Sequence, residues 1–288
     1  MLWALAAFVA SFSWATADLI SKQLMNHRGE NRYHTLWARF LASNLPMGVA
    51  LWLQGIPPIG PHFWWAFPTV ILGDTVASIC YITALEEAPI SLTVPLLSSA
   101  PLFMLLTSSL ILGEFPSVKG SLGVILVVTG AYLLNLHLAK GGALKPLKEL
   151  VRSRASRLVL AAAFIFSLDT AFGKMVLQST NVTFFGLTYC VGMGLAMVPV
   201  LIYKTGSLPL RKMASPPFVA LGILFGTGIL CFLYAMGETN IAYVSGVGRL
   251  SMVIAVLYGK FFFKEQHIAQ RIAGSLVILS GVVLILLH

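Results

Sequence analysis

The sequence predicts an all-α polytopic membrane protein in which ten transmembrane helices form two inverted five-helix repeats. Of its 288 residues, 58% are hydrophobic and only 10% are charged, whereas an ordinary soluble domain has about 25% charged residues. A soluble protein of this length would not bury so much apolar surface, because its own exterior has to be wetted. Long apolar runs recur along the chain, and one residue pattern occurs twice, half a chain length apart.

Breaks rich in polar residues, proline or glycine divide the chain into apolar segments of about the length that crosses a bilayer, roughly 20 residues. The ten segments lie near residues 2–25, 33–53, 62–86, 89–112, 117–138, 158–177, 183–203, 215–237, 241–262 and 267–287. The first lacks a basic leader region and exceeds the apolar core of a signal peptide, so we interpret it as a retained helix. A basic connector over residues 139–157 separates the first predicted repeat, 1–138, from the second, 158–288.

The repeated pattern is a glutamate followed by two glycines at fixed spacing. Its two copies, 151 positions apart throughout, are Glu114, Gly123, Gly130 and Glu265, Gly274, Gly281. Further pairs keep the same order at offsets of 151 or 153: Asp18 with Asp169, Gly73 with Gly226, and Tyr81 with Tyr234. Each half has an odd number of segments, so two such units in series enter the membrane from opposite sides. We therefore expect the repeat to be inverted.

The net charge of +9 comes mainly from basic residues in the connectors and at the ends of the apolar segments. This distribution indicates membrane topology and not a nucleic-acid-binding surface. Sixteen of the nineteen Lys and Arg residues, Arg39 among them, lie at the connectors after the first, fifth, seventh and ninth segments. By the positive-inside rule these connectors are cytoplasmic and both termini lie outside. The sequence thus predicts an integral protein of the plasma (inner) membrane.

Four ionisable side chains are predicted near helix centres: Asp18, Asp74, Asp169 and Arg249. A central Asp or Arg costs about 2.5–3.5 kcal/mol even on translocon scales, so residues of this kind usually have a function. The three carboxyl groups are candidates for proton coupling, because a carboxyl group that alternates between wet and dry surroundings can load and release a proton. The alternative is a structural role, in which they hydrogen-bond to Ser, Thr or backbone groups inside the bundle.

The fourth and ninth segments are both interrupted near their middle. Pro95 and Pro101 flank Ser98 and Ser99 in the fourth, and glycines precede Arg249 in the ninth, 151 positions after Ser98. Interrupted segments at corresponding places of two halves indicate a binding site, and a guanidinium group suits carboxylate or phosphate oxygens. We therefore expect Arg249, Ser98 and Ser99 to contact substrate, with a permanent Arg249–Asp ion pair as the structural alternative. Aromatic side chains that are candidates to line the same cavity are Trp14, Tyr81, Tyr234 and Tyr243.

The stretch YITALEEAPISLTVPLLSSAPLFMLLTSSLILGE, from Tyr81 to Glu114, together with Gly123 and Gly130 resembles the EamA-type members of the drug/metabolite transporter superfamily. The resemblance covers essentially the whole chain. The second half is more divergent, with Met236-Gly237 where the first half has Thr83-Ala84. The resemblance implies ten helices, a central cavity between the halves and alternating access of a small metabolite.

The sequence favours a secondary transporter of a small polar metabolite, an amino acid or other zwitterion, with export and proton coupling as further hypotheses. A cationic solute is the alternative, given three aspartates. A membrane enzyme is disfavoured, because the six histidines fall at helix ends or in connectors and the three cysteines form no CxxC pair. No cofactor and no metal site are expected. The predicted partners are the substrate, protons and the lipid bilayer, and no oligomeric state is implied.

The predicted topology, with the 139–157 connector in the cytoplasm and the C-terminus outside, can be tested by thiol labelling. Single cysteines introduced into the 139–157 connector should resist an impermeant thiol reagent in intact cells, whereas a cysteine beside His288 should react. The background would lack Cys80, Cys190 and Cys231. Reaction of the connector but not of the C-terminus would reverse the assigned orientation.

Overall fold

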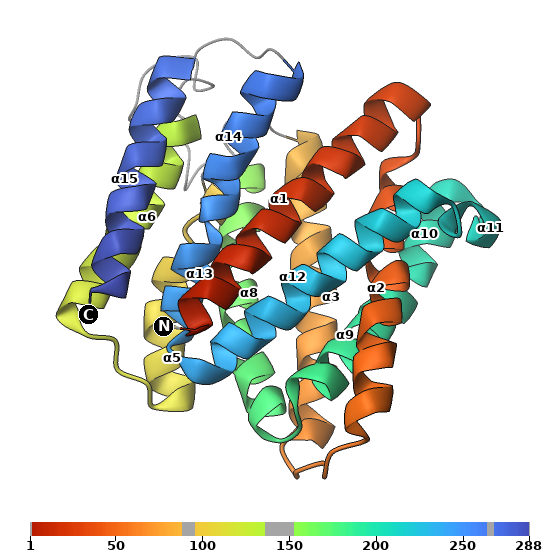
Figure 1. The fold of residues 1–288 in the computed structure, drawn as a ribbon, viewed down its shortest axis with the longest axis horizontal. Helices are drawn as coiled ribbons and strands as arrows, with labels where there is room; N and C mark the ends of the chain where they lie inside the picture. The colour runs from red at the N-terminus through yellow and green to blue at the C-terminus, as the bar shows by residue number, and fades with distance from the viewer. Residues whose placement is uncertain (1, 88–95, 136–152, 264–267, 288) are drawn as a thin grey trace. The chain divides into compact units, whose positions relative to one another are not determined.

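The computed structural model of the chain describes residues 2–87, 96–135, 153–263 and 268–287 (Figure 1). Every element in these ranges is an α-helix, which confirms the all-α class. The helices are α1 (Leu2–Arg28), α2 (Arg32–Gln54), α3 (Phe63–Glu87), α5 (Ala100–Leu112), α6 (Val118–Asn135), α8 (Arg154–Gln178), α9 (Val182–Ala196), α10 (Val198–Thr205), α11 (Leu210–Met213), α12 (Pro216–Glu238), α13 (Ile241–Gly248), α14 (Leu250–Phe263) and α15 (Ile268–Leu286). Residues 136–152, most of the predicted connector, and Glu265 lie outside the described ranges.

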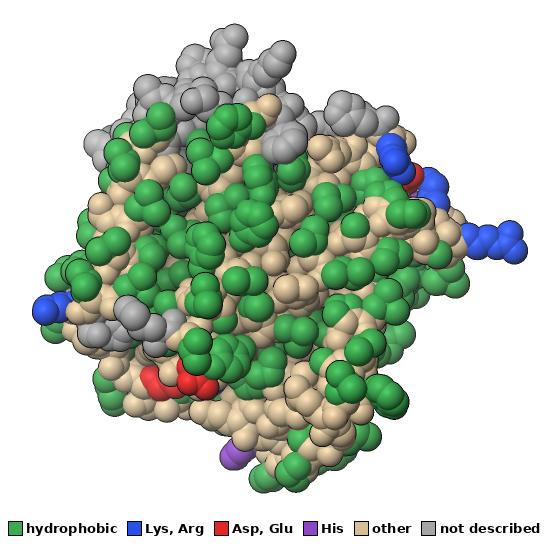
Figure 2. Space-filling view, in the orientation of Figure 1, with side chains coloured by type: hydrophobic (Ala, Val, Ile, Leu, Met, Phe, Trp, Pro, Cys, Tyr) green, Lys and Arg blue, Asp and Glu red, His purple; other side chains and the backbone are tan. Residues whose placement is uncertain are grey.

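Six stretches of the described helices are long and apolar enough to cross a membrane. They are Leu2–Met25, Phe63–Tyr81, Arg154–Gln178, Val182–Thr205, Pro216–Glu238 and Ile241–Tyr258. Three shorter apolar helices are Ala100–Leu112, Val118–Leu133 and Ile272–Leu286. Hydrophobic side chains also dominate the face drawn in Figure 2, and Trp52, Leu110 and Phe115 are each more than 80% exposed. These features define an integral membrane protein, while the count of ten crossings stays a prediction.

Asparagine side chains begin three of the helices. The side-chain oxygens of Asn31, Asn181 and Asn240 accept hydrogen bonds from the first turns of α2, α9 and α13. Such caps satisfy backbone donors that the helix itself leaves without a partner. At the C-terminal end of α5, Gly113 adopts a left-handed conformation with φ of 66°, which glycine adopts without steric cost.

The helices form two compact units. Unit 1 comprises Met1–Leu72 and Gly173–Glu238, and unit 2 comprises Gly73–Phe172 and Thr239–His288. In unit 1, α12 packs against α1 and α2, and α2 packs against α9. The buried core of this unit includes Trp37, Phe40, Met193, Phe218 and Leu221. The boundary falls inside α3 and α8, so each of these two helices contributes residues to both units.

In unit 2, α6 and α15 lie side by side and pack closely (Figure 1). A methyl group on Gly130 would lie 2.6 Å from the amide nitrogen of Ile278 and 2.8 Å from the carbonyl oxygen of Gly274. Gly123 meets Gly281 in the same way, at 2.8 Å. The later glycine of each helix thus contacts the earlier glycine of the other, so the two helices run in opposite directions. Small residues permit this approach where lipid provides no hydrophobic driving force.

The glycine contacts predict a large effect from a single methyl group. Gly130→Ala should destabilise the protein by about 1–3 kcal/mol, because the added carbon overlaps backbone atoms of α15. The matched control is Gly48→Ala in α2, where a methyl group meets nothing within 4 Å and alanine raises helix propensity by up to about 1 kcal/mol. Thermal unfolding in detergent would measure both variants. Equal melting temperatures for the two would contradict the close packing.

Candidate functional site

Both predicted helix interruptions are present in unit 2, and they share one backbone geometry. The amide of Ser99 donates to the carbonyl oxygen of Leu96 at 3.1 Å, just before α5. The amide of Arg249 donates to the carbonyl oxygen of Gly246 at 3.0 Å, between α13 and α14. Each is a bond between residues three apart, which tightens the chain into a single 3₁₀-like turn. The normal helical ladder is therefore interrupted at both places.

The two interruptions lie close together. The Ser98 hydroxyl, on a side chain that is 2% exposed, donates to the sulfur of Met252 at 3.7 Å. Met252 follows Arg249 by one helical turn. The neighbouring Ser99 hydroxyl donates to its own helix, at the carbonyl oxygen of Leu96. Ser98 therefore faces the second interruption, whereas the described contact of Ser99 is to the local backbone.

Arg249 stands at the second interruption with part of its guanidinium group unsatisfied. Its Nε is buried and has no hydrogen-bond partner among the described residues. The phenol of Tyr81 on α3 interacts with it electrostatically. An unmet donor on a buried charged group is costly, so this nitrogen is available to an acceptor that the described chain does not provide.

A second polar cluster in unit 2 joins α3 to α8. The Asp169 side chain is 5% exposed, and its Oδ1 packs directly against the α-carbon side of Gly73, where a methyl group would collide with it. Its Oδ2 is buried and has no hydrogen-bond partner among the described residues. Asp74 acts on it electrostatically. Two of the three predicted carboxyl groups are thus brought together.

Asp18, the third predicted carboxyl group, lies in unit 1 in a different setting. Its Oδ1 accepts a hydrogen bond at 2.7 Å from Nη2 of Arg39, which also donates to the Ser21 hydroxyl at 2.8 Å. The guanidinium carbon of Arg39 lies 5.5 Å from the centre of the Phe225 ring, in range for a cation–π contact. Asp18 is an ion-paired carboxylate whose side chain is 61% exposed.

Arg39 is the residue that sequence reasoning missed. The count of basic residues places it in the cytoplasmic topology signal, but it lies seven residues into α2 and pairs with a carboxylate. The sequence did contain a signal for this ion pair. Asp18 and Arg39 lie at similar distances on either side of the turn that joins α1 to α2, so a hairpin of these helices brings them close together. The position 151 residues after Arg39 holds Cys190, so the second half has no matching guanidinium for Asp169.

The four predicted aromatic residues occur in both units. In unit 1, the Trp14 ring lies 5.3 Å from the ring of Phe232, and its buried Nε1 has no hydrogen-bond partner among the described residues; Tyr234 is 39% exposed. In unit 2, Tyr81 accompanies Arg249. Tyr243 is 2% exposed, and its hydroxyl accepts from the amide of Ser117 at 2.7 Å, at the start of α6. That contact joins α13 to the start of α6.

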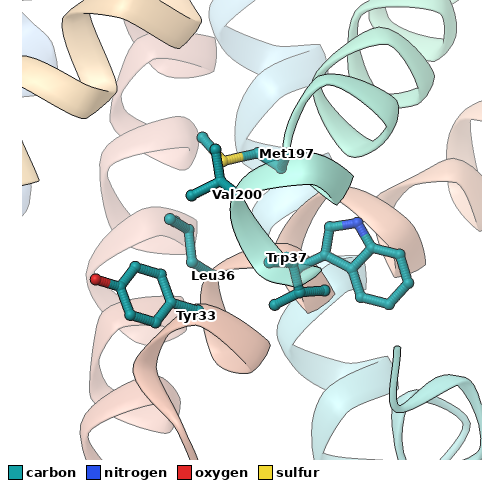
Figure 3. A pocket seen from close by; sticks show the side chains of 6 residues that line it. Tyr33, Leu36, Trp37, Met197 and Val200 are labelled. Carbon is teal, nitrogen blue, oxygen red and sulfur yellow. The ribbon is translucent and has the colours of Figure 1, made fainter. Parts of the chain in front are cut away.

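A small, shallow pocket in unit 1 is lined by none of these polar residues (Figure 3). Its lining consists of Tyr33, Leu36, Trp37, Met197, Val200 and Leu201. The indole nitrogen of Trp37 already donates to the carbonyl oxygen of Gly194 at 2.9 Å. The pocket presents no charged group and none of the predicted site residues.

No metal centre is evident within the described ranges, where no three His, Cys, Asp or Glu side chains gather in a group that could hold an ion. Cys80, Cys190 and Cys231 are free thiols. Unit 2 instead holds the guanidinium group of Arg249 and, separately, the neighbouring carboxyl groups of Asp74 and Asp169. Such groups can bind charged parts of a small molecule.

Apolar helices that hold charged side chains between them are features of an integral membrane protein. The chain belongs to the EamA-like transporter family, whose model matches residues 1–136 and 154–287. This match confirms the resemblance noted from the sequence.

Similar proteins agree with this assignment. A protein of Methanothermobacter thermautotrophicus described as an uncharacterized transporter is 27% identical over 219 residues, which cover 74% of this chain and 62% of that protein. Another uncharacterized transporter, from Archaeoglobus fulgidus, is 24% identical over 226 residues, 76% of this chain and 74% of that protein. A crystal structure with 16% identity has the same fold, with a TM-score of 0.80, and the match covers 99% of this chain and 96% of the other.

A double-mutant cycle can measure how much the Asp18–Arg39 ion pair contributes to stability. Arg39→Gln leaves a carboxylate without its cation, whereas Asp18→Asn combined with Arg39→Gln removes both charges. We expect a coupling free energy of about 1 kcal/mol, the upper part of the range for exposed ion pairs. Thermal unfolding of the four proteins in detergent would measure it, with Arg28→Gln at the end of α1 as the control for loss of one cation. Strict additivity of the two single variants would show that the pair contributes nothing.

Proposed function

We propose that the protein moves a small zwitterionic metabolite, such as an amino acid, across the membrane by alternating access, and that Arg249 binds its carboxylate. The observation that carries the proposal is the buried Nε of Arg249 without a hydrogen-bond partner among the described residues. A planar guanidinium group presents several donors in a fixed fork that matches a carboxylate. A substrate oxygen at this position satisfies a donor that is otherwise unmet.

The surroundings of Arg249 support a binding role. The residue stands at a helix interruption, and Ser98, at the equivalent interruption in the first half, lies within one turn of it. Interrupted helices at matching places are typical of transporter binding sites. Tyr81 adds an aromatic side chain with a polar tip next to the guanidinium group.

Alternating access requires two related halves, and three observations favour an inverted repeat with ten helices. Two stretches of similar length match the family model. The glycines of α6 and α15 contact one another in opposite order. The interruptions at Ser99 and Arg249 have the same backbone hydrogen bonds. Two such halves can open to either side around a fixed site. We further propose that the basic connectors face the cytoplasm.

The carboxyl groups extend the proposal to proton coupling, through Asp169 and Asp74 in unit 2 and Asp18 in unit 1. A second candidate substrate is a cationic solute. The observation that favours it is the proximity of Asp169 to Asp74, because two neighbouring carboxyl groups attract a cation. The two candidates differ in whether Arg249 is required for binding.

The test combines a ligand screen with one conservative variant. Purified protein would be screened by thermal shift against amino acids, amines, sugars and phosphates, and the best ligand would be measured by equilibrium binding. Arg249→Lys should weaken an anionic or zwitterionic ligand about tenfold or more, because a point charge does not reproduce the fork. Arg28→Lys, on an exposed helix end, is the matched control. Unchanged affinity of Arg249→Lys would remove Arg249 from recognition, and a response to amines alone would favour the cationic solute.

A further inference from the structure

In unit 1, the end of α10 and the short helix α11 expose apolar and basic side chains next to one another. The exposed apolar residues are Ile202, Tyr203, Leu208 and Leu210. Lys204 and Arg211 are also exposed here, and neither has an ion-pair partner among the described residues. Basic side chains stand out in Figure 2 where Figure 1 draws these two helices. Tyrosine together with Lys and Arg is typical of the level at which a membrane meets water.

Two features hold this α10–α11 surface beside the start of α2. Gly206 ends α10 in a left-handed conformation with φ of 68°, and α11 begins four residues later, at Leu210. The ammonium group of Lys212 in α11 then donates to Oε2 of Glu30, just before α2, at 2.8 Å. This ion pair neutralises both of its members. The charge that remains on the α10–α11 surface therefore comes from Lys204 and Arg211.

The apolar pocket of Figure 3 lies one helical turn before this surface. Val200 lines the pocket, and Lys204 follows Val200 by four residues, so their side chains share one face of α10. At 1.5 Å of rise per residue, Lys204 stands about 6 Å further along the helix axis. Tyr33 and Leu36, from the first turns of α2, also line the pocket, and like Val200 they are only partly buried. A partly open apolar pocket thus lies one turn from an uncompensated cation.

These two levels match the levels of a bilayer. The apolar stretch Val182–Thr205 is long enough to cross a membrane, and Lys204 stands at its end. The headgroup region is about 5–7 Å thick on each side, because the hydrocarbon core is about 30 Å thick and the whole bilayer about 40–45 Å. With Lys204 at the level of the headgroups, Val200 and the pocket lie where the acyl chains begin.

We propose that the α10–α11 surface and the pocket together bind one anionic phospholipid, with its phosphate at Lys204 and Arg211 and the start of one acyl chain in the pocket. The two cations determine the headgroup class, because anionic lipids attract basic segments at the membrane surface. The apolar lining favours a lipid over a free phosphate, which has no group to place in the pocket. The inference concerns the surrounding lipid and is independent of which solute the protein transports.

Native mass spectrometry of the purified protein would count bound lipids and measure their affinities. Dioleoyl phosphatidylglycerol and dioleoyl phosphatidylcholine share their acyl chains and differ in net charge, and glycerol 3-phosphate is the soluble anion. We expect one phosphatidylglycerol to bind at least about tenfold more tightly than phosphatidylcholine, because each Lys or Arg near an anionic lipid contributes about fivefold. Glycerol 3-phosphate should not displace it. Equal affinity for the two lipids, or displacement by glycerol 3-phosphate, would overturn the inference.

Charge variants test the position of the headgroup. Lys204→Gln should reduce the preference for phosphatidylglycerol over phosphatidylcholine about fivefold, and Arg211→Gln should act similarly. The matched control is Lys119→Gln, which removes an exposed lysine from the first turn of α6 in unit 2. No loss in the first two variants, or an equal loss in the control, would contradict a headgroup site at α10 and α11.

A bulky side chain in the pocket tests the position of the acyl chain. Val200→Trp should weaken the binding of both lipids by a similar factor and leave the preference for phosphatidylglycerol intact, and Val200→Phe replaces it should it fail to fold. Val191→Trp, at an exposed position of α9 outside the pocket lining, is the control. Unchanged lipid affinity in the Val200 variant would show that no chain occupies the pocket. A wild-type dimer that the same variant abolishes would assign the pocket to a second copy of the chain and overturn the proposal.

Discussion

The cost of leaving a polar group unsatisfied in a hydrocarbon environment constrains every part of this molecule. Lipid offers no hydrogen-bond partner, so backbone and side-chain groups must be satisfied within the protein or by a ligand. Most hydroxyl groups meet this demand locally, as Ser11 and Thr129 do by donating to the carbonyl oxygen four residues earlier. Where the helical ladder is interrupted, at Ser99 and Arg249, a tight turn satisfies the backbone. Among the described residues, buried side-chain atoms without a hydrogen-bond partner occur on charged residues, such as Arg39, Asp169 and Arg249, and also on neutral ones, such as Trp14, Asn44 and Ser156.

The same constraint explains how the helices associate. Hydrophobic burial does not favour one helix over lipid, so close van der Waals contact has to supply the attraction. The glycines of α6 and α15 bring the two backbones together, and Gly228 of α12 leaves room for the indole of Trp14. Gly73 serves a different purpose, because the space of its missing side chain is occupied by the carboxyl group of Asp169. One residue type thus builds both a helix contact and part of the candidate site.

The two halves differ most where charge is concerned. Asp18 and Asp169 occupy matching positions in the sequence, yet Asp18 is paired with Arg39 and largely exposed, while Asp169 is buried beside Asp74. The difference follows from single residue differences between positions that lie 151 residues apart. Arg39 in the first half corresponds to Cys190 in the second, and Ser98 in the first half corresponds to Arg249 in the second. Each half therefore supplies one guanidinium group that the other lacks.

The sequence by itself determined the helical class, the apolar segments, the interruptions at Ser98–Ser99 and Arg249 and the glycines that pack α6 on α15. These features follow from local composition and from the spacing of residues along one chain. Only the tertiary structure decided which charges meet. From the sequence, Arg39 is counted among the basic residues that indicate membrane topology. Only the structure shows that α1 and α2 form a hairpin that places Arg39 against Asp18. Tyr243 is a candidate cavity residue from the sequence, and only the structure shows that its hydroxyl accepts a hydrogen bond from the amide of Ser117. Electrostatic and hydrogen-bond partners depend on distances between segments far apart in the chain, and no local pattern encodes those distances.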